Sequence, residues 1–127
     1  MSMKDEVLLS FLVPVYNVEA FVGECLQSLF DCGLEQSSFE VIVMLDGSKD
    51  GSEAVVRTFN ECNLKIYNQE NKGLAQTRNE LLKLASGKYV WFVDSDDKIE
   101  PRSVATFLSV MEDGDLDVLM FDYQDWD

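Results

Sequence analysis

Residues 7–17 read Val-Leu-Leu-Ser-Phe-Leu-Val-Pro-Val-Tyr-Asn, an apolar run of strand length that ends in polar residues. Shorter apolar runs follow at residues 41–45, 64–67, 89–93 and 118–121. Runs that are apolar on both faces are typical of parallel strands covered by helices. Together with the helical segments between them, they predict an α/β fold with right-handed crossovers and a mostly parallel sheet.

Four segments between or after these runs have the apolar spacing of buried helix faces. They are residues 19–30, 52–59 and 74–84, and a helix that begins near Pro101. Proline is well tolerated in the first turn of a helix, where its missing N–H has no partner to lose. The expected order is therefore β-α-β-α-β-α-β-α-β.

Composition excludes several classes of protein. The chain has 127 residues, of which 46% are hydrophobic, enough for one domain with a buried core. No apolar run approaches the roughly 18 residues of a membrane span. The formal net charge of −14 argues against binding nucleic acid. The absence of histidine excludes His-based zinc sites and Ser-His or Cys-His catalysis.

The cysteines and the start of the chain bear on its location. Three cysteines without a CxxC motif indicate reduced thiols in a cytoplasmic protein. Residues 1–6 are polar and acidic and do not read as a secretion signal. Attachment to the inner face of a membrane would have to come from parts outside this sequence.

Polar motifs follow each of the first four strands. Asn17 and Glu19 follow the first, Asp46 the second, Asn71 the third, and Asp94 the fourth. Ligands of open α/β sheets bind beyond the carboxyl ends of the strands. Each motif alone is more simply read as a turn or a helix cap. Their convergence on one edge of the sheet favours a ligand crevice.

The segment Asp94-Ser95-Asp96-Asp97 carries three carboxylates that repel one another. Mg²⁺ or Mn²⁺ would relieve this repulsion by oxygen coordination. The alternative is a solvated acidic loop before the helix at Pro101. The turn at residues 46–52 is glycine-rich, but it lacks the ending of a Walker motif, and a GxGxxG fingerprint is absent.

Residues 11–19, 46–52, 71–79 and 87–97 together resemble the family 2 glycosyltransferases with the GT-A fold. The resemblance implies a three-layer, Rossmann-like GT-A domain that is truncated here. Residues 1–127 would then be a single nucleotide-sugar-binding domain, the N-terminal part of a longer enzyme.

The resemblance also implies roles for individual residues. Asp96 and Asp94 would bind Mg²⁺ or Mn²⁺, and Asp46 would accept a hydrogen bond from a uracil-like base. The residues implied to bind the nucleotide-diphosphate sugar are Pro14, Tyr16, Asn17, Glu19, Asp46, Gly47, Ser48, Arg78, Asp94, Ser95 and Asp97. Many members carry two acidic residues before the Gly-Ser turn, whereas Leu45 takes the first place here, so guanine and thymine nucleotides stay open as alternatives to uridine.

The implied activity is transfer of a sugar from its nucleotide to an acceptor hydroxyl, with inversion, in polysaccharide or glycoconjugate synthesis. UDP-sugars are the favoured donors, and the acceptor would be a glycan or lipid-linked. The family supplies its catalytic carboxylate from beyond the fifth strand, so the catalytic base is unknown here, and this chain is expected to bind the donor only.

Two other classes stay open. A haloacid-dehalogenase-like phosphatase also places a DxD motif after an apolar strand, but normally near its N-terminus and with a lysine and further acids downstream. A non-catalytic module, such as a receiver-like domain, would need acidic residues after the first strand, where Tyr16 and Asn17 stand.

Overall fold

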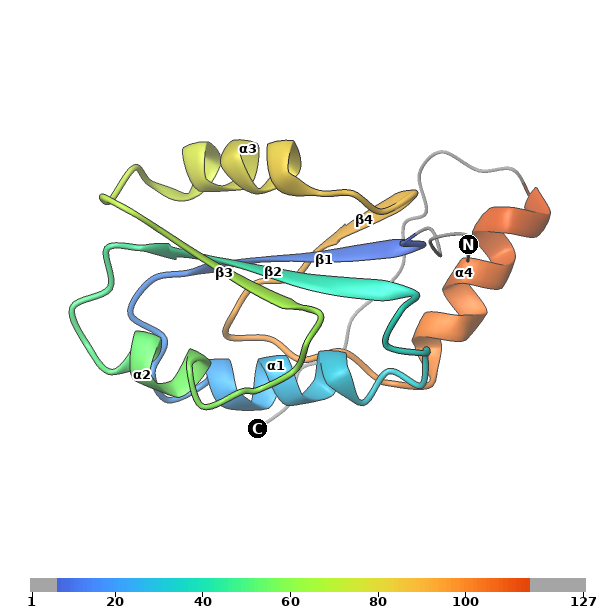
Figure 1. Cartoon of the computed structure of the whole chain (residues 1–127), viewed down its shortest axis with the longest axis horizontal. Helices are drawn as coiled ribbons and strands as arrows, with labels where there is room; N and C mark the ends of the chain where they lie inside the picture. Colours follow the sequence, from blue (N-terminus) through green and yellow to red (C-terminus); the bar gives the residue numbers. More distant parts are fainter. Residues whose placement is uncertain (1–6, 115–127) are drawn as a thin grey trace, which may run out of the picture.

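A computed structural model describes residues 7–114 of the chain. Four parallel strands form one sheet in the order β3-β2-β1-β4 (Figure 1). Their bounds are β1 (Leu9–Val15), β2 (Phe39–Asp46), β3 (Leu64–Gln69) and β4 (Tyr89–Phe92). The predicted parallel α/β fold is confirmed for these elements. The strand predicted at residues 118–121 lies outside the described residues.

Helices lie on both faces of the sheet and make three layers (Figure 1). They are α1 (Val22–Phe30), α2 (Ser52–Val56), α3 (Leu74–Leu84) and α4 (Ser103–Gly114). α3 covers one face, and α1 and α2 cover the other (Figure 1). None of these helices within residues 7–114 has the length and apolar character that a membrane crossing requires.

Two helices are shorter than their apolar spacing predicted. α1 begins at Val22 rather than at residue 19, and α2 ends at Val56 rather than at residue 59. Before α1, the N–H groups of Val18 and Glu19 donate to side chains of the loop after β2. Tertiary hydrogen bonds therefore hold these residues outside the helix.

The core consists of two layers because side chains alternate between the faces of a strand. Phe11, Val13 and Val15 of β1 belong to the larger cluster, which α1, α2 and α4 cover. Leu12 of β1 belongs to the smaller cluster, together with residues of β2 and Leu81 of α3. The fold thus fixes which residues at the strand ends face α1 and which face α3.

β4 separates from β1 before β1 ends. The pairing of these strands stops at Leu12 and Phe92, with one further bond from Val93 N to the carbonyl of Leu12, whereas β1 pairs with β2 as far as Val15 and Leu45. Proline has no N–H to donate, so it is tolerated where a neighbouring strand has ended. Pro14 occupies such a position, and the divergence opens the sheet beside it.

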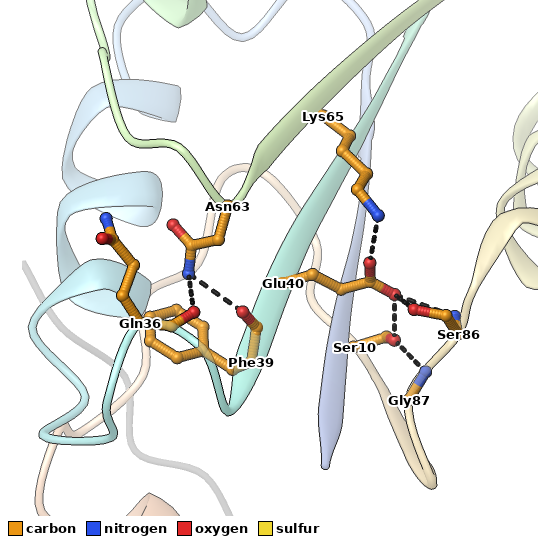
Figure 2. Close-up of polar contacts among 8 residues, drawn as sticks. All are labelled: Ser10, Gln36, Phe39, Glu40, Asn63, Lys65, Ser86 and Gly87. Atoms are coloured by element: carbon orange, nitrogen blue, oxygen red, sulfur yellow. Dashed lines mark hydrogen bonds and ion pairs between the residues drawn. The ribbon is translucent and has the colours of Figure 1, made fainter. Parts of the chain in front are cut away.

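A buried carboxylate organises the opposite end of the sheet (Figure 2). Glu40 is 2% exposed and accepts hydrogen bonds from Ser10 Oγ at 2.6 Å and Lys65 Nζ at 2.7 Å. It also accepts from Ser86 N at 2.8 Å and Ser86 Oγ at 2.9 Å. Burial alone would raise the pKa of Glu40, but Lys65 and the hydroxyl and N–H donors outweigh it and hold this pKa below its ordinary value.

We predict that Glu40→Gln lowers the free energy of unfolding at pH 7 by about 1–3 kcal/mol, because donors in the interior lose a charged acceptor. Since the pKa of Glu40 is depressed in the folded state, its contribution is complete above the ordinary pKa of 4.5 and is lost as the pH falls below that value. Urea unfolding should therefore show a gap between wild type and variant that narrows from pH 7 to pH 3.

The matched control is Glu53→Gln, which removes an exposed carboxylate paired with Arg57 within α2. This change should alter the stability by less than about 0.5 kcal/mol at either pH. An equal loss in the two variants, or a gap for Glu40→Gln that does not depend on pH, would contradict the prediction.

Candidate functional site

The carboxyl ends of the four strands lie at one edge of the sheet, at the left of Figure 1. From β1 the chain continues to β2 and β3 on one side, while β4 lies on the other side of β1. This reversal is a topological switch point, where open α/β sheets bind their ligands. The pairing of β4 with β1 ends before β1 reaches this edge.

The loop after β1 is bound to the loop after β2. Asn17 has a positive φ of 52° and offers both its backbone and its side chain to the second loop. Its N–H donates to Ser48 Oγ at 3.1 Å, and its Oδ1 accepts from Lys49 N at 2.8 Å. Two residues of the predicted donor site, Asn17 and Ser48, are therefore in direct contact.

The same two loops meet again at Glu19. Its N–H donates to Asp50 Oδ2 at 3.1 Å, and its Oε1 accepts from Gly51 N at 3.0 Å. Ser52 is fully buried, and its Oγ accepts from Val18 N at 2.8 Å and donates to Asp50 Oδ1 at 2.6 Å. These paired contacts give the start of α1 and the start of α2 a fixed relative position.

A shallow hollow of about 570 Å³ lies beside this contact between the loops. Its lining residues are Asn17, Val18, Glu19, Ala20, Phe21, Asp50 and Val55. None of the three carboxylates of the acidic segment lines it. We place the candidate site by the chemistry of the strand ends rather than by this hollow, because no Lys or Arg lines the hollow, whereas Arg78 meets the carboxylates at the strand ends.

Asp46, the last residue of β2, faces α3 and is 4% exposed. Its carboxylate accepts hydrogen bonds from Lys72 N at 2.8 Å, Gln69 Nε2 at 2.9 Å and Gly73 N at 3.1 Å. Its carbonyl accepts from Asn71 Nδ2 at 3.1 Å. The loop between β3 and α3 is thus bound to the end of β2 by one side chain.

The acidic segment after β4 forms a compact cluster. Asp94, Asp96 and Asp97 are exposed, and one carboxylate oxygen from each lies within 4.8 Å of the others. A turn with a hydrogen bond from Asp97 N to the carbonyl of Asp94, at 2.9 Å, holds the three together. Ser95 points away from solvent and is 6% exposed. Oxygen donors at this spacing fit a hard divalent cation.

Arg78 of α3 brings a positive charge to this cluster. Its Nη2 donates to Asp94 Oδ1 at 3.1 Å. Its Nε is buried and has no hydrogen-bond partner among the described residues. The two predicted site residues therefore meet, and the guanidinium keeps further N–H donors for other acceptors.

The acidic cluster shifts the pKa values of its neighbours. Partial burial and the charges of Asp96 and Asp94 raise the pKa of Asp97 above its ordinary value. Burial, followed by the charges of the three aspartates, raises the pKa of Cys25 to about 12. The thiol of Cys25 lies 3.7 Å from the carbonyl of Asp94 and stays protonated at neutral pH. A cation at the cluster would relieve the repulsion among the carboxylates.

The structure adds residues to the site that the sequence analysis did not single out. Asp50 and Ser52 connect the first two loops, and Gln69, Lys72 and Gly73 engage Asp46. The polar side chains that follow β2 and end β3 are the signal in the sequence that could have indicated Asp50, Ser52 and Gln69. Backbone N–H donors such as those of Lys72 and Gly73 leave no such signal.

A parallel α/β sheet with a carboxylate cluster and an arginine at its switch point defines the class of doubly wound α/β proteins with a ligand site at the strand ends. Comparison with known proteins narrows this class. Residues 10–125 match the sequence family described as glycosyl transferase family 2, and the chain belongs to this family.

Individual relatives agree with the assignment. The chain is 38% identical over 117 residues to the glycosyltransferase GlyA of Streptococcus pneumoniae, covering 91% of this chain and 16% of GlyA. Among solved structures, it resembles Staphylococcus aureus TarS 1–349 in complex with UDP-GlcNAc, with a TM-score of 0.79 and 34% identity over 84% of this chain and 32% of the other.

A third relative differs in its nucleotide. The mannosyltransferase PcManGT of Pyrobaculum calidifontis, in complex with GDP-Man and Mn²⁺, matches with a TM-score of 0.73 and 25% identity, covering 85% of this chain and 32% of the other. The chain therefore spans between 16% and 32% of the length of these three relatives. The predicted GT-A-type α/β fold and the family are confirmed by these matches.

The contact between the loops after β2 and β3 leads to a test of stability. Gly47 has a φ of +79°, and a Cβ there would lie 3.1 Å from Asn71 N. We predict that Gly47→Ala lowers the free energy of unfolding by more than the roughly 1–2 kcal/mol of a left-handed alanine, because the loop at Asn71 must also move. Urea unfolding measures the loss.

Gly33→Ala is the matched control. Gly33 has a φ of +88°, but a Cβ there would meet nothing within 4 Å. This variant should show the backbone strain alone. Equal losses in the two variants would mean that the packing of Gly47 against Asn71 contributes nothing to stability.

Proposed function

We propose that this chain binds a nucleotide-diphosphate sugar at the strand-end edge, as part of an enzyme that transfers the sugar to an acceptor hydroxyl. The observation that carries the proposal is the acidic cluster at the switch point, with Arg78 bound to Asp94. Membership of glycosyl transferase family 2 supports a nucleotide-diphosphate sugar as the ligand of this arrangement. The complex of TarS with UDP-GlcNAc supports a UDP-sugar as the donor.

A divalent cation, Mg²⁺ or Mn²⁺, fits the cluster. The oxygens of Asp94, Asp96 and Asp97 lie close enough together to share one ion, and carboxylates are ligands that both ions accept. Asp96 and Asp94 would hold it. Bound there, the ion would supply positive charge opposite the departing diphosphate. The Mn²⁺ in the PcManGT complex is consistent with this assignment.

The charge of the chain gives a further reason for a cation. The donor is an anion, and the protein has a formal net charge of −14. Without a cation, the donor would approach a carboxylate-lined edge against electrostatic repulsion. Arg78 would offset part of that repulsion, because its guanidinium places a positive charge at the cluster and has further Nη hydrogens besides the one donated to Asp94.

The other proposed contacts come from the loops that the structure brings to the same edge. Ser95 and Asp97 would lie near the sugar, and the loops after β1 and β2 would border the nucleoside. The residues proposed to border the nucleoside, from these two loops and from the end of β1, are Pro14, Tyr16, Asn17, Glu19, Gly47 and Ser48. Tyr16 is 46% exposed and offers an aromatic surface.

Transfer in the whole enzyme would use a carboxylate to take the proton of the acceptor hydroxyl. The acceptor we propose is a glycan or a lipid-linked acceptor, and the site of action is the cytoplasm. We propose that the strand-end loops within the described residues bind the donor. We assign no residue of this chain as the catalytic base.

We predict that Mn²⁺ and UDP together raise the thermal midpoint of the chain by roughly 5–10 °C when UDP is near 100 times its Kd, because a ligand that binds only the folded state stabilises it. Asp96→Asn should abolish this joint shift, since one carboxylate of the cluster is lost. Differential scanning fluorimetry with Mn²⁺ alone, UDP alone and both ligands measures it.

Asp31→Asn is the control, because Asp31 is an exposed aspartate at the end of α1 whose side chain accepts, among residues 7–114, a hydrogen bond from Gln27. It should respond to the ligands as the wild type does. If Asp96→Asn also responds as the wild type does, Asp96 does not hold the ion. If the wild type shows no joint shift, the proposed donor site is wrong.

A further inference from the structure

Asp46 has little capacity left for a ligand. A carboxylate offers about four acceptor positions, and three are occupied by Lys72 N, Gln69 Nε2 and Gly73 N. The side chain is also 4% exposed, beneath the loop that supplies these donors. A nucleobase could displace a donor only by leaving a buried N–H without an acceptor.

The residues that donate hydrogen bonds to Asp46 are themselves bonded to the first turn of α3. Gln69 Nε2 also donates to Thr77 Oγ1 at 3.0 Å, and Thr77 Oγ1 donates to the carbonyl of Gly73 at 2.7 Å. The N–H of Thr77 donates to the same carbonyl at 3.0 Å. Asp46 is therefore bound to the beginning of α3 both through the backbone of Gly73 and through Gln69.

Arg78 directly follows Thr77 on this turn. Its Nη2 reaches Asp94 at 3.1 Å, and its buried Nε has no partner among the residues that the structure describes. The carboxylate of Asp46 accepts hydrogen bonds from the residues just before α3, and Arg78 lies one residue after Thr77 on the same helix. A chain of contacts thus runs from the end of β2 to the acidic cluster after β4.

We propose that Asp46 is a positioning residue: its carboxylate holds the loop at residues 71–73 and thereby places Arg78 beside Asp94 at the donor site. This inference rests on the proposed function. The contact with the nucleobase that the family resemblance implies for Asp46 stays a prediction. The two roles differ in how the effect of an Asp46 substitution depends on the nucleobase. A positioning residue affects every nucleotide alike, whereas a residue that reads the base affects one base more than another.

Calorimetric titration of UDP and ADP in Mn²⁺ separates the two roles. Asp46→Ala should weaken the binding of both nucleotides by the same factor, about tenfold, because Arg78, the proposed partner of the phosphates, is displaced. The ratio of the two affinities should stay that of the wild type. Asp46→Asn, which keeps the size of the side chain and one acceptor oxygen, should lie between wild type and Asp46→Ala, and Asp31→Ala should bind as the wild type does.

A double-mutant cycle tests whether Asp46 acts through Arg78. In the Arg78→Ala background, Asp46→Ala should weaken UDP binding by less than about twofold, since the group that it positions is already absent. Full additivity of the two losses would overturn the inference. So would a loss in Asp46→Ala that is confined to UDP, because that result would identify a contact with the base.

Hydrogen exchange of the Lys72 and Gly73 amides tests the loop without any nucleotide. Exchange at both amides should be faster in Asp46→Ala than in wild type by tenfold or more, and unchanged in Arg78→Ala. Equal exchange in wild type and Asp46→Ala would overturn the inference. If wild type binds neither nucleotide, the proposed function fails, and the exchange result still decides whether Asp46 holds the loop.

Discussion

The common direction of the four strands is the constraint on which the candidate site depends. Because every pair in the sheet is parallel, the carboxyl ends of all four strands lie at one edge. Residues as distant in sequence as Asn17 and Asp94 are brought to that edge for this reason alone. Each crossover returns through a helix, so every strand end becomes the start of a loop whose backbone and side chains can meet its neighbours.

Polar side chains connect those loops to one another. Asn17 and Glu19 engage the loop after β2, and Asp46 engages the loop after β3. A side chain committed to such contacts keeps a defined position before any ligand arrives, which lowers the entropy lost on binding. The acidic cluster after β4 differs, because its carboxylates are exposed and repel one another. It is the part of the edge that a cation would stabilise most.

Much of the fold follows from local sequence patterns. The apolar run at β1 and the spacing in α3 predict elements close to those observed, because burial on both faces of a strand leaves a visible composition. The apolar run at β4 also predicts a strand, but Val90 and Phe92 on one of its faces are exposed. The start of α1 was predicted less well, since the N–H groups of Val18 and Glu19 donate to side chains of another segment. α2 ends earlier than predicted because Thr58 and Phe59 donate to carbonyls three residues back rather than four. The family and the position of the acidic segment were also predictable, because those motifs are contiguous in the chain.

The sequence by itself determined the parallel α/β class, the strand-end location of the polar motifs and the carboxylate cluster at Asp94, Asp96 and Asp97. Only the tertiary structure decided what each side chain contacts. Asp46 shows the difference: its position after a strand predicts a residue at the ligand edge, yet its carboxylate is occupied by Gln69 and two backbone N–H groups. Backbone donors look the same at every residue in a sequence, so the partner of a buried acid becomes visible only when the chain is folded.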